Sequence, residues 1–328
     1  MAFGIPHLDV KLELSIRSDM KRVEELLRQQ IQGDYPLVIE TSRHLVEAGG
    51  KRLRPLLTLL AAQFGDPKRP EIIEAAVVCE LTHLATLYHD DVMDEAPLRR
   101  GVKSANARWN NTVAILTGDY LFAKASDLLA DLGPQAVRLQ ARTFERLVIG
   151  QITETQGSTS GLSALNHYLS VVADKTGSLI ATSARFGALL SGATPEIVES
   201  LTRFGEKIGV VFQLADDIID IASESNESGK TPGTDLREGV PTLVTLLVLE
   251  SKDPADQELR NILSAPITDE QVVTNTLAQL RSHAALGASR KILQQYADEA
   301  RLDLNNLPDG AAKRALIELC ETIITRTS

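Results

Sequence analysis

Apolar residues recur every three or four positions along most of the chain. The pattern is clear in residues 71–90 and 282–304, and it places apolar side chains on one face of an α-helix. No segment shows a convincing signal for paired strands. Breaks fall where Gly, Pro and Asp cluster, at residues 33–36, 64–70, 131–134, 156–163 and 191–195. These features predict an all-α fold of roughly ten helices, and the short connections indicate a single domain over residues 1–328.

The charge balance and the apolar runs limit the class of protein. The chain of 328 residues carries 34 basic and 44 acidic side chains, a formal net charge of −10. Nucleic-acid binding requires clustered Lys and Arg side chains, so we expect no nucleic-acid partner. The first thirty residues lack the apolar core of a targeting signal. Apolar runs such as residues 243–249 are far shorter than the roughly 20 residues of a membrane span, so we expect no integral membrane association.

The two cysteines bear on the compartment. Cys79 and Cys320 lie far apart, each in an apolar segment with a helical pattern. Buried free thiols are typical of a reducing compartment, whereas a disulfide framework is typical of secreted domains. We therefore expect a cytoplasmic protein.

Two connections are unusual. Residues 222–241 form a polar stretch between two apolar segments, and a connection of this length is more often a functional lid than a passive linker. Residues 49–55, GGKRLRP, place three cations between a glycine pair and a proline. Taken alone, this second segment also fits a solvated helix start.

Two acidic clusters carry the strongest chemical signal. The first is HDDVMD at residues 89–94, and the second is DDIID at residues 216–220. On a helix, Asp90 and Asp94 lie on one face, one turn apart, and Asp216 is related to Asp220 in the same way. Both clusters follow apolar runs that we expect to be buried. Because like charges at this spacing destabilise a helix, we expect a bound cation to compensate them.

The donor types favour Mg²⁺. Carboxylate oxygens without nearby His or Cys ligands suit this ion, which protein carboxylates usually share with a substrate phosphate. An exposed acidic helix end explains one such cluster, but it explains two much less well. A phosphohydrolase using His89 and Asp90 would need further His ligands at suitable spacing, and the sequence lacks them. Cations that can balance a diphosphate lie near the acidic clusters and in the long polar segment, at Arg99, Arg100, Lys175 and Lys230.

Five motifs occur in a characteristic order. They are GGKRLRP at residues 49–55, DDVMDEAPLRRG at 90–101, KTG at 175–177, FQLADDIID at 212–220 and GKTPGTDL at 229–236. With these motifs the chain resembles the trans-prenyltransferases, the all-trans polyprenyl diphosphate synthases, over essentially its whole length. The resemblance implies an isoprenoid-synthase fold of antiparallel helices around a deep central cavity, a homodimer, and a reaction that joins isopentenyl diphosphate to an allylic diphosphate.

The resemblance also implies a role for each matching residue. Three Mg²⁺ ions per active site would bridge the allylic diphosphate to Asp90, Asp94 and Asp216, with closer support from Asp91, Asp217 and Asp220. The allylic substrate would contact Arg99, Lys175, Thr176, Gln213 and Lys230, and the last four are also the catalytic candidates. The diphosphate of isopentenyl diphosphate would bind Lys51, Arg54, His83 and Arg100. Without the resemblance, His83 reads as an ordinary core residue, although it lies two helical turns before Asp90 on one face.

The chemistry needs no covalent enzyme intermediate. Departure of diphosphate from the allylic carbon leaves a delocalised cation, and positioned cations stabilise the charge that builds on the leaving oxygens. Dipoles in a dry cavity would stabilise the carbocation, and Thr176, Gln213 and the Lys175 carbonyl are the candidates. Attack by the isopentenyl double bond and loss of a proton then extend the chain by one unit.

Small residues next to the first acidic cluster suggest a long product. Ala85 and Thr86 lie about one turn before Asp90, where short-chain members of the family tend to have aromatic rings, and Thr82 lies a further turn away. The alternative is that these residues merely allow close helix packing. We expect a long, membrane-soluble all-trans product for quinone side chains, with a far tunnel floor on the helix that contains Phe144, Leu147 and Val148.

Three other functions stay open at this point. The first is a shorter-chain farnesyl or geranylgeranyl diphosphate synthase. The second is a non-catalytic subunit of a heteromeric prenyl synthase, although such subunits usually lose acidic residues that are intact here. A class I terpene synthase performs the same ionisation with one DDxxD motif, but it leaves Lys51, Arg54 and Arg100 unexplained.

Overall fold

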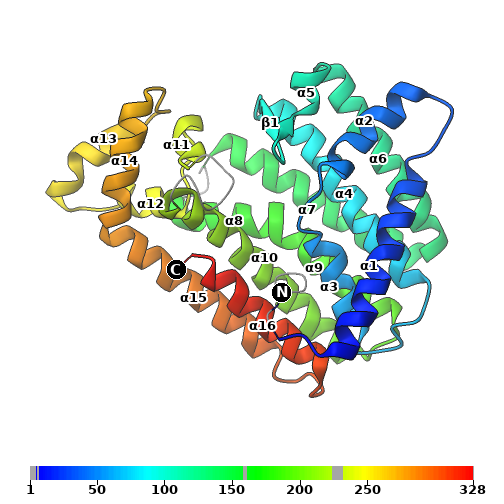
Figure 1. Cartoon of the computed structure of the whole chain (residues 1–328). Coiled ribbons are helices and arrows are strands. Elements are labelled where there is room, and N and C mark those ends of the chain that lie inside the picture. The colour runs from blue at the N-terminus through cyan, green and yellow to red at the C-terminus, as the bar shows by residue number, and fades with distance from the viewer. Residues whose placement is uncertain (1–4, 6, 158–160, 224–231, 328) are drawn as a thin grey trace. The chain divides into compact units, whose positions relative to one another are not determined.

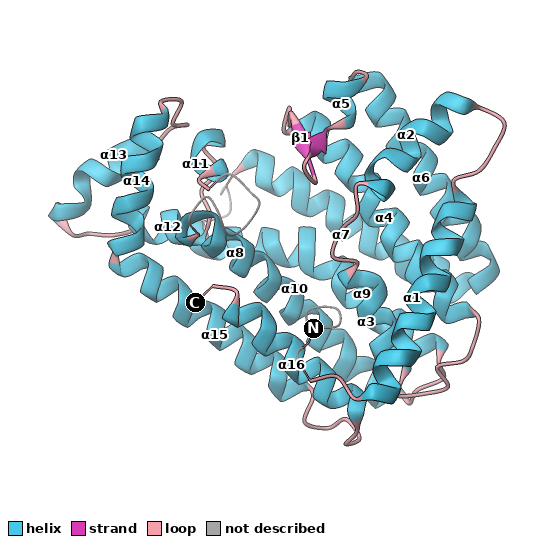
Figure 2. Ribbon diagram, viewed as in Figure 1, coloured by secondary structure: helices cyan, strands magenta, loops and turns pink. Residues whose placement is uncertain are grey.

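The computed structural model describes residue 5 and residues 7–157, 161–223 and 232–327. Sixteen α-helices, α1 to α16, account for most of these residues (Figures 1 and 2). The all-α prediction is therefore confirmed. There are more helices than the expected ten because several connections contain short helices, such as α5 (Ala105–Arg108) and α11 (Thr234–Glu238).

One small sheet was not expected from the sequence. β1 (Leu98–Arg99) pairs antiparallel with β2 (Val102–Lys103). The two residues between the strands, Arg100 and Gly101, both have positive φ, at 53° and 78°. Positive φ at both central positions is typical of a tight hairpin turn that matches the twist of its strands. The hairpin follows the first acidic cluster directly and presents Arg99 and Arg100.

The chain forms two compact units. The first comprises Met1–Phe144, Leu179–Gly205 and Asn306–Leu316, and the second comprises Glu145–Ser178, Glu206–Asn305 and Ile317–Ser328. The chain passes from one unit to the other within α7 (Pro134–Gln156), α10 (Pro195–Ala222) and α16 (Ala311–Thr325), at the first residue of α9 (Ser178–Leu190), and in the connection after α15 (Ala284–Asp303). The single-domain interpretation of residues 1–328 stays a prediction.

In the first unit, α4 (Glu71–Met93) is the central helix. It packs most extensively along α6, and it also contacts α3 and α1. Because it is apolar on nearly all sides, residues such as Leu81 and Tyr88 are fully buried. Gly118 of α6 allows this close packing, since a Cβ atom there would lie 2.4 Å from Nε2 of His89. The neighbouring helices are α1 (Val10–Gln30), α2 (Pro36–Glu47), α3 (Leu53–Ala62), α6 (Asn111–Leu132) and α9 (Ser178–Leu190).

In the second unit, α12 (Leu243–Leu249) is a short buried helix that packs against α15, α13 and α8. A five-residue π-helix, Ala173–Gly177, lies between α8 and α9 without a break in the chain path. Such insertions are rare and occur frequently at functional sites. The remaining helical elements are α8 (Ala164–Val172), a 3-10 turn (Pro254–Asp256), α13 (Gln257–Leu263), α14 (Glu270–Ser282) and α15 (Ala284–Asp303).

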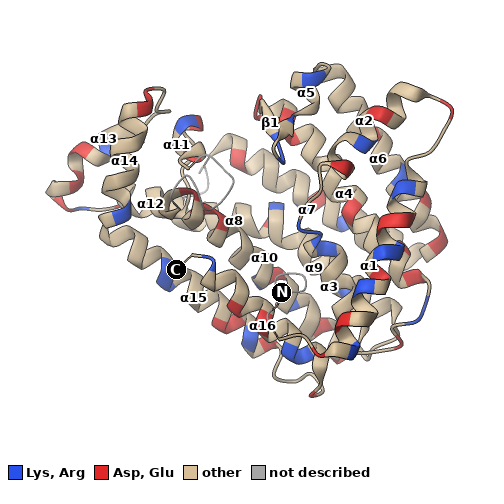
Figure 3. Ribbon diagram, viewed as in Figure 1, with Lys and Arg blue, Asp and Glu red and all other residues tan. Residues whose placement is uncertain are grey.

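The two cysteines, Cys79 and Cys320, are free and buried, as expected from the sequence. Burial raises the pKa of each thiol to about 12. Acidic and basic positions alternate along α1, which has a polar exposed face (Figure 3). In the part of the chain that the structure describes, we find no helix long and apolar enough to cross a membrane.

Candidate active site

The first acidic cluster lies at the C-terminal end of α4. Asp90 and Asp91 belong to the last turn, and Asp94 is the C-cap residue, whose backbone N–H donates to the Asp90 carbonyl. The C-terminus of a helix carries a partial negative charge, so carboxylates there are destabilised both by one another and by the helix. The sequence-based expectation of a compensating cation therefore gains a second physical reason.

Asp91 and Arg99 fix the hairpin against α4. The Asp91 side chain is fully buried, and its Oδ1 accepts a hydrogen bond of 2.6 Å from Nε of Arg99. Burial raises the pKa of Asp91, and its second oxygen has no hydrogen-bond partner. Nη2 of Arg99 lies 3.7 Å from Asp94. Asp91 therefore positions Arg99 beside the more exposed carboxylate of Asp94.

Cations converge on one region of the first unit. Arg54 of α3 is partly buried, its buried Nε has no hydrogen-bond partner, and burial lowers its pKa. Arg100 donates to the carbonyl of Leu45 over 2.7 Å and to that of Gly49. Burial, then Arg54 and Arg100, hold the pKa of His83 well below its ordinary value. His83 is therefore a neutral ring beside two guanidinium groups, which is an arrangement suited to binding an anion.

The absence of a side chain at Gly50 leaves room for the Arg100 guanidinium group. Its φ is +146°, and a Cβ atom at this position would lie 2.9 Å from the Arg100 guanidinium carbon. A larger residue would displace the guanidinium group. The glycine pair in GGKRLRP therefore has a steric role next to the cations that follow it.

A buried carboxylate that sequence reasoning missed balances these cations in part. Glu80 of α4 is 1% exposed, and its Oε1 lies 2.7 Å from Nη1 of Arg52 and 3.9 Å from Nη2 of Arg100. Arg52 also pairs with a second carboxylate, because its Nε donates a hydrogen bond of 2.6 Å to Oε1 of Glu24. The only sequence signal is a glutamate within the apolar pattern of residues 71–90.

The second acidic cluster lies in the last turns of α10. Asp217 is 4% exposed and accepts hydrogen bonds from the Tyr168 hydroxyl and from Nε2 of Gln213, the latter over 2.9 Å. Burial raises the pKa of Asp217 to about 6. Oδ1 of Asp216 accepts a hydrogen bond of 3.0 Å from Arg326, close to the C-terminus. Asp217 is thus a supporting residue, and Asp216 is the more accessible carboxylate.

Asp220 caps the next helix. Its carboxylate accepts hydrogen bonds from the backbone N–H groups of Thr234 at 3.2 Å and Asp235 at 3.3 Å, and α11 begins at Thr234. A carboxylate at a helix start satisfies N–H groups that lack partners within the helix. The polar 222–241 segment is therefore anchored to the acidic cluster at Thr234 and Asp235. Residues 224–231, including Lys230, lie outside the described residues, so the lid stays a prediction.

The π-helix presents Lys175 and Thr176. Nζ of Lys175 lies 2.6 Å from Oε2 of Glu154 on α7. The Thr176 hydroxyl donates to Oε1 of Gln213 over 3.3 Å, and Gln213 in turn donates to Asp217. The second unit thus joins Thr176, Gln213 and Asp217 in one hydrogen-bonded chain.

The placement of the carboxylates suits an ion with few protein ligands, such as Mg²⁺, better than an ion whose ligands all come from the protein. Among the described residues, no three acidic, His or Cys side chains are placed to hold an ion together. Mg²⁺ usually takes only one or two carboxylates and completes its shell with water and phosphate oxygens. Within the first unit, the paired carboxylates of Asp90 and Asp94 are of the type that such an ion binds, and within the second unit so is the carboxylate of Asp216.

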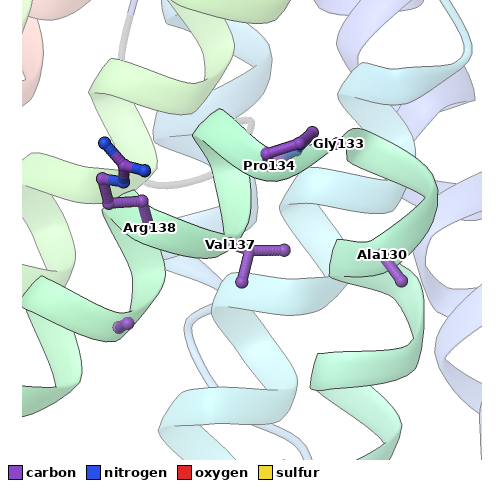
Figure 4. A pocket seen from close by; sticks show the side chains of 6 residues that line it. Ala130, Gly133, Pro134, Val137 and Arg138 are labelled. Carbon is purple, nitrogen blue, oxygen red and sulfur yellow. The ribbon is translucent and has the colours of Figure 1, made fainter.

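The predicted chain-length residues are buried. Ala85 is 0% exposed, and Thr86, at 9%, donates its hydroxyl to the His83 carbonyl over 2.8 Å. Val148 is 38% exposed, so its side chain is a poor candidate for an interior floor. A surface pocket of about 540 Å³ lies at the junction of α6 and α7 and contains none of the predicted site residues (Figure 4).

Comparisons with known proteins show the family of the chain. Residues 35–280 match the family model for polyprenyl synthetase, and the chain belongs to this family. It is a prenyltransferase, a polyprenyl diphosphate synthase. A nonaprenyl diphosphate synthase from Mycobacterium tuberculosis is 48% identical over 98% of this chain and 97% of the relative. A dimethylallyltranstransferase from the same organism is 40% identical, with 97% of each chain covered.

Solved structures are similar over nearly the full length. The geranylgeranyl pyrophosphate synthase of Corynebacterium glutamicum, solved with calcium and isoprenyl diphosphate, has a TM-score of 0.88 and 44% identity, covering 98% of this chain and 99% of that one. A decaprenyl diphosphate synthase from Rhodobacter capsulatus has a TM-score of 0.88 and 31% identity, covering 97% and 99%. The resemblance expected from the five sequence motifs is therefore confirmed.

Proposed function

We propose that this polyprenyl diphosphate synthase condenses isopentenyl diphosphate repeatedly onto an allylic diphosphate to make a long all-trans chain for quinone side chains. The observation that carries the proposal is the pair of carboxylate clusters in the last turns of α4 and α10, together with the cations around Arg54. Acidic groups at helix C-termini bind metal cations, and buried guanidinium groups bind phosphate. A diphosphate substrate needs both.

Asp90, Asp94 and Asp216 would hold Mg²⁺, with three ions per active site. Bound Mg²⁺ supplies positive charge to the leaving diphosphate oxygens. Buried Asp91 and Asp217 stay outside the metal shell and hold neighbouring groups in position, since Asp91 binds Arg99 and Asp217 binds Gln213. The related Corynebacterium glutamicum structure, which contains calcium and isoprenyl diphosphate, supports a divalent ion.

Lys51, Arg54, His83 and Arg100 would bind the diphosphate of isopentenyl diphosphate. Arg54 has a buried Nε without a partner, so an incoming phosphate oxygen would satisfy it. His83 is neutral and would donate one ring N–H without adding charge. Arg100 is already fixed by two backbone carbonyls, so little side-chain freedom is lost on binding.

Arg99, Lys175, Thr176, Gln213 and Lys230 would contact the allylic substrate. Lys175 and Arg99 would stabilise the negative charge on the departing diphosphate. The hydroxyl of Thr176 and the amide of Gln213 are joined by a hydrogen bond, which orients their dipoles. The oxygen atoms of this pair would face the developing allylic cation and stabilise it.

The product length rests on the small residues of α4. Ala85 and Thr86 are small side chains beside the acidic cluster, where an aromatic ring would fill more volume, and the Mycobacterium tuberculosis relative is a nonaprenyl diphosphate synthase. A geranylgeranyl product is the second candidate, because the Corynebacterium glutamicum neighbour is a geranylgeranyl pyrophosphate synthase.

The enzyme would act as a cytoplasmic homodimer. Ile115 and Leu116 of α6 are 42% and 61% exposed, and Val137 of α7 is 44% exposed in the pocket of Figure 4. Neighbouring exposed apolar side chains on α6 are typical of a surface that a second protein covers. A second copy of the chain would bury them.

Turnover by the purified chain alone tests the function. The protein is incubated with labelled isopentenyl diphosphate, an allylic diphosphate and Mg²⁺, with an EDTA-treated sample as control. Incorporation of label into an extractable polyprenyl product supports the proposal. Absence of incorporation, with the protein folded, would instead support the non-catalytic subunit of a heteromeric synthase.

A further inference from the structure

A hydrogen bond links α4 to α7 below the proposed allylic site. Nε2 of Gln140 donates to Oγ1 of Thr82 over 2.7 Å. Thr82 is 0% exposed and Gln140 is 7% exposed. Thr82, Thr86 and Asp90 follow one another at four-residue intervals, so they lie along one stripe of α4. The Gln140 contact is therefore two helical turns, about 12 Å of helix rise, from Asp90.

Buried threonines surround this contact in the first unit. Thr82 donates to the Val78 carbonyl over 2.8 Å, and Thr86 binds its own helix in the same way. Thr143, one turn after Gln140 on the buried face of α7, donates to the Leu139 carbonyl over 2.9 Å and also shares a hydrogen bond of 2.6 Å with the Thr182 hydroxyl of α9. Because the hydroxyls of Thr82 and Thr86 donate to their own helix, their methyl groups are the parts that can contact hydrocarbon.

Gln140 differs from these threonines. Its Oε1 is buried and has no hydrogen-bond partner. An unpaired buried oxygen destabilises the closed position of the side chain, and such groups are uncommon in native interiors. One neutral hydrogen bond holds the amide in place. Burial of an isoprene unit is worth more than such a bond, so a growing tail can displace this side chain.

We propose that Gln140 is a gate on the product path and determines how far the chain elongates. The proposal rests on the function proposed above, in which the tail extends from the site at Asp90 along the Thr86 and Thr82 stripe. The tail of a short intermediate ends at the Gln140 side-chain amide while that amide is hydrogen-bonded to Thr82. Further elongation breaks the Gln140–Thr82 hydrogen bond and moves the Gln140 side chain aside, so short intermediates are retained longer at this stage than later ones.

Product chain-length analysis of three variants tests the gate. Gln140→Ala opens the path, and we expect the ratio of long to short products at limiting isopentenyl diphosphate to rise several-fold. Thr82→Val removes the acceptor at nearly constant volume and shifts the ratio in the same direction. Gln140→Trp cannot move aside as readily, and the main product becomes short. Gln135→Ala and Gln135→Trp, at an exposed position of α7, are matched controls with wild-type products.

The outcomes separate the gate from the enzyme function. If Gln140→Ala and Thr82→Val both give the wild-type distribution while label is incorporated, the gate is wrong and the synthase function stands. Thr82→Val preserves side-chain volume, so this result is informative even where Gln140→Trp fails to fold. If the wild-type protein incorporates no label, the proposed function itself fails.

Discussion

Arg326 donates a hydrogen bond of 3.0 Å to Oδ1 of Asp216, across 110 residues of sequence. Both side chains are partly exposed, at 33% for Arg326 and 21% for Asp216. Asp216 is a proposed metal ligand, so the guanidinium group occupies a carboxylate that Mg²⁺ would bind. With Asp216 as a ligand, the ion pair and a bound metal ion would compete for one oxygen.

Removal of Arg326 should strengthen metal binding. A partly exposed ion pair is worth up to about 1 kcal/mol, so we expect Arg326→Gln to lower the Mg²⁺ concentration for half-maximal turnover by about two- to five-fold. Titration of activity with Mg²⁺ measures this. Arg314→Gln, at an exposed position of α16, which ends one residue before Arg326, is the control. An unchanged Mg²⁺ dependence in Arg326→Gln would show that the pair does not compete with the metal.

Loss of one metal ligand should abolish most turnover with little change in stability. We expect Asp90→Ala or Asp216→Ala to reduce kcat by about 10³-fold or more. The free energy of unfolding should be unchanged or slightly higher for Asp90→Ala, which removes a like-charge contact near a helix C-terminus. Asp216→Ala also removes the partly exposed ion pair with Arg326, so its free energy of unfolding should fall by at most about 1 kcal/mol. Activity assays and urea denaturation of the metal-free proteins measure both effects. Asp127→Ala, at an exposed position of α6, should retain activity, and near-normal turnover in either ligand variant would contradict the metal assignment.

The surroundings of His83 predict a pH dependence of stability. Burial and the nearby arginines hold its pKa well below 6.5 in the folded protein. Below that pH the unfolded chain binds a proton at this position and the folded chain does not, so His83 lowers the free energy of unfolding as pH falls. This decrease in the free energy of unfolding is at most about 1.4 kcal/mol per pH unit. Urea denaturation near pH 7 and pH 5.5 measures how much the free energy of unfolding falls between the two pH values. We expect this fall to be smaller for His83→Gln than for wild type by about 1 kcal/mol. Equal falls in the two proteins would contradict the prediction.

The Glu80–Arg52 pair should contribute strongly to stability. Their side chains are 2% and 8% exposed, and removal of Glu80 leaves the buried guanidinium group of Arg52 with Glu24 as its remaining carboxylate partner. We expect Glu80→Ala to lower the free energy of unfolding by about 3–5 kcal/mol. Glu40→Ala is the matched control, since Glu40 pairs with Arg108 at the surface, with side chains 55% and 43% exposed, and should cost at most about 1 kcal/mol. Equal losses in urea denaturation would contradict this prediction.

The sequence predicted features that depend on local spacing. Four-residue intervals were sufficient to place Asp90 near Asp94 and Asp216 near Asp220 on helices, and order and spacing of motifs were sufficient to identify the family. The β1–β2 hairpin was missed because its strands have two residues each, too few for a recognisable alternation.

The missed site residues depend on tertiary packing. Glu80 meets Arg52 across 28 residues, and Tyr168 meets Asp217 across 49. Neither distance follows from a helical period. Arg326 near the C-terminus has no motif of its own, and its partner is set by the packing of the C-terminal segment from Ile317 within the second unit. Such contacts become visible only when the helices are placed.

The chain lengths of the products made by the wild-type enzyme test the central claim most directly. Purified protein is supplied with excess labelled isopentenyl diphosphate, an allylic diphosphate and Mg²⁺, and the products are resolved by length beside those of Ala85→Phe. We expect a long all-trans product from wild type, and a main product near the farnesyl or geranylgeranyl length from Ala85→Phe, because the added ring fills the space beside the acidic cluster. A wild-type product already that short would contradict the long-chain function.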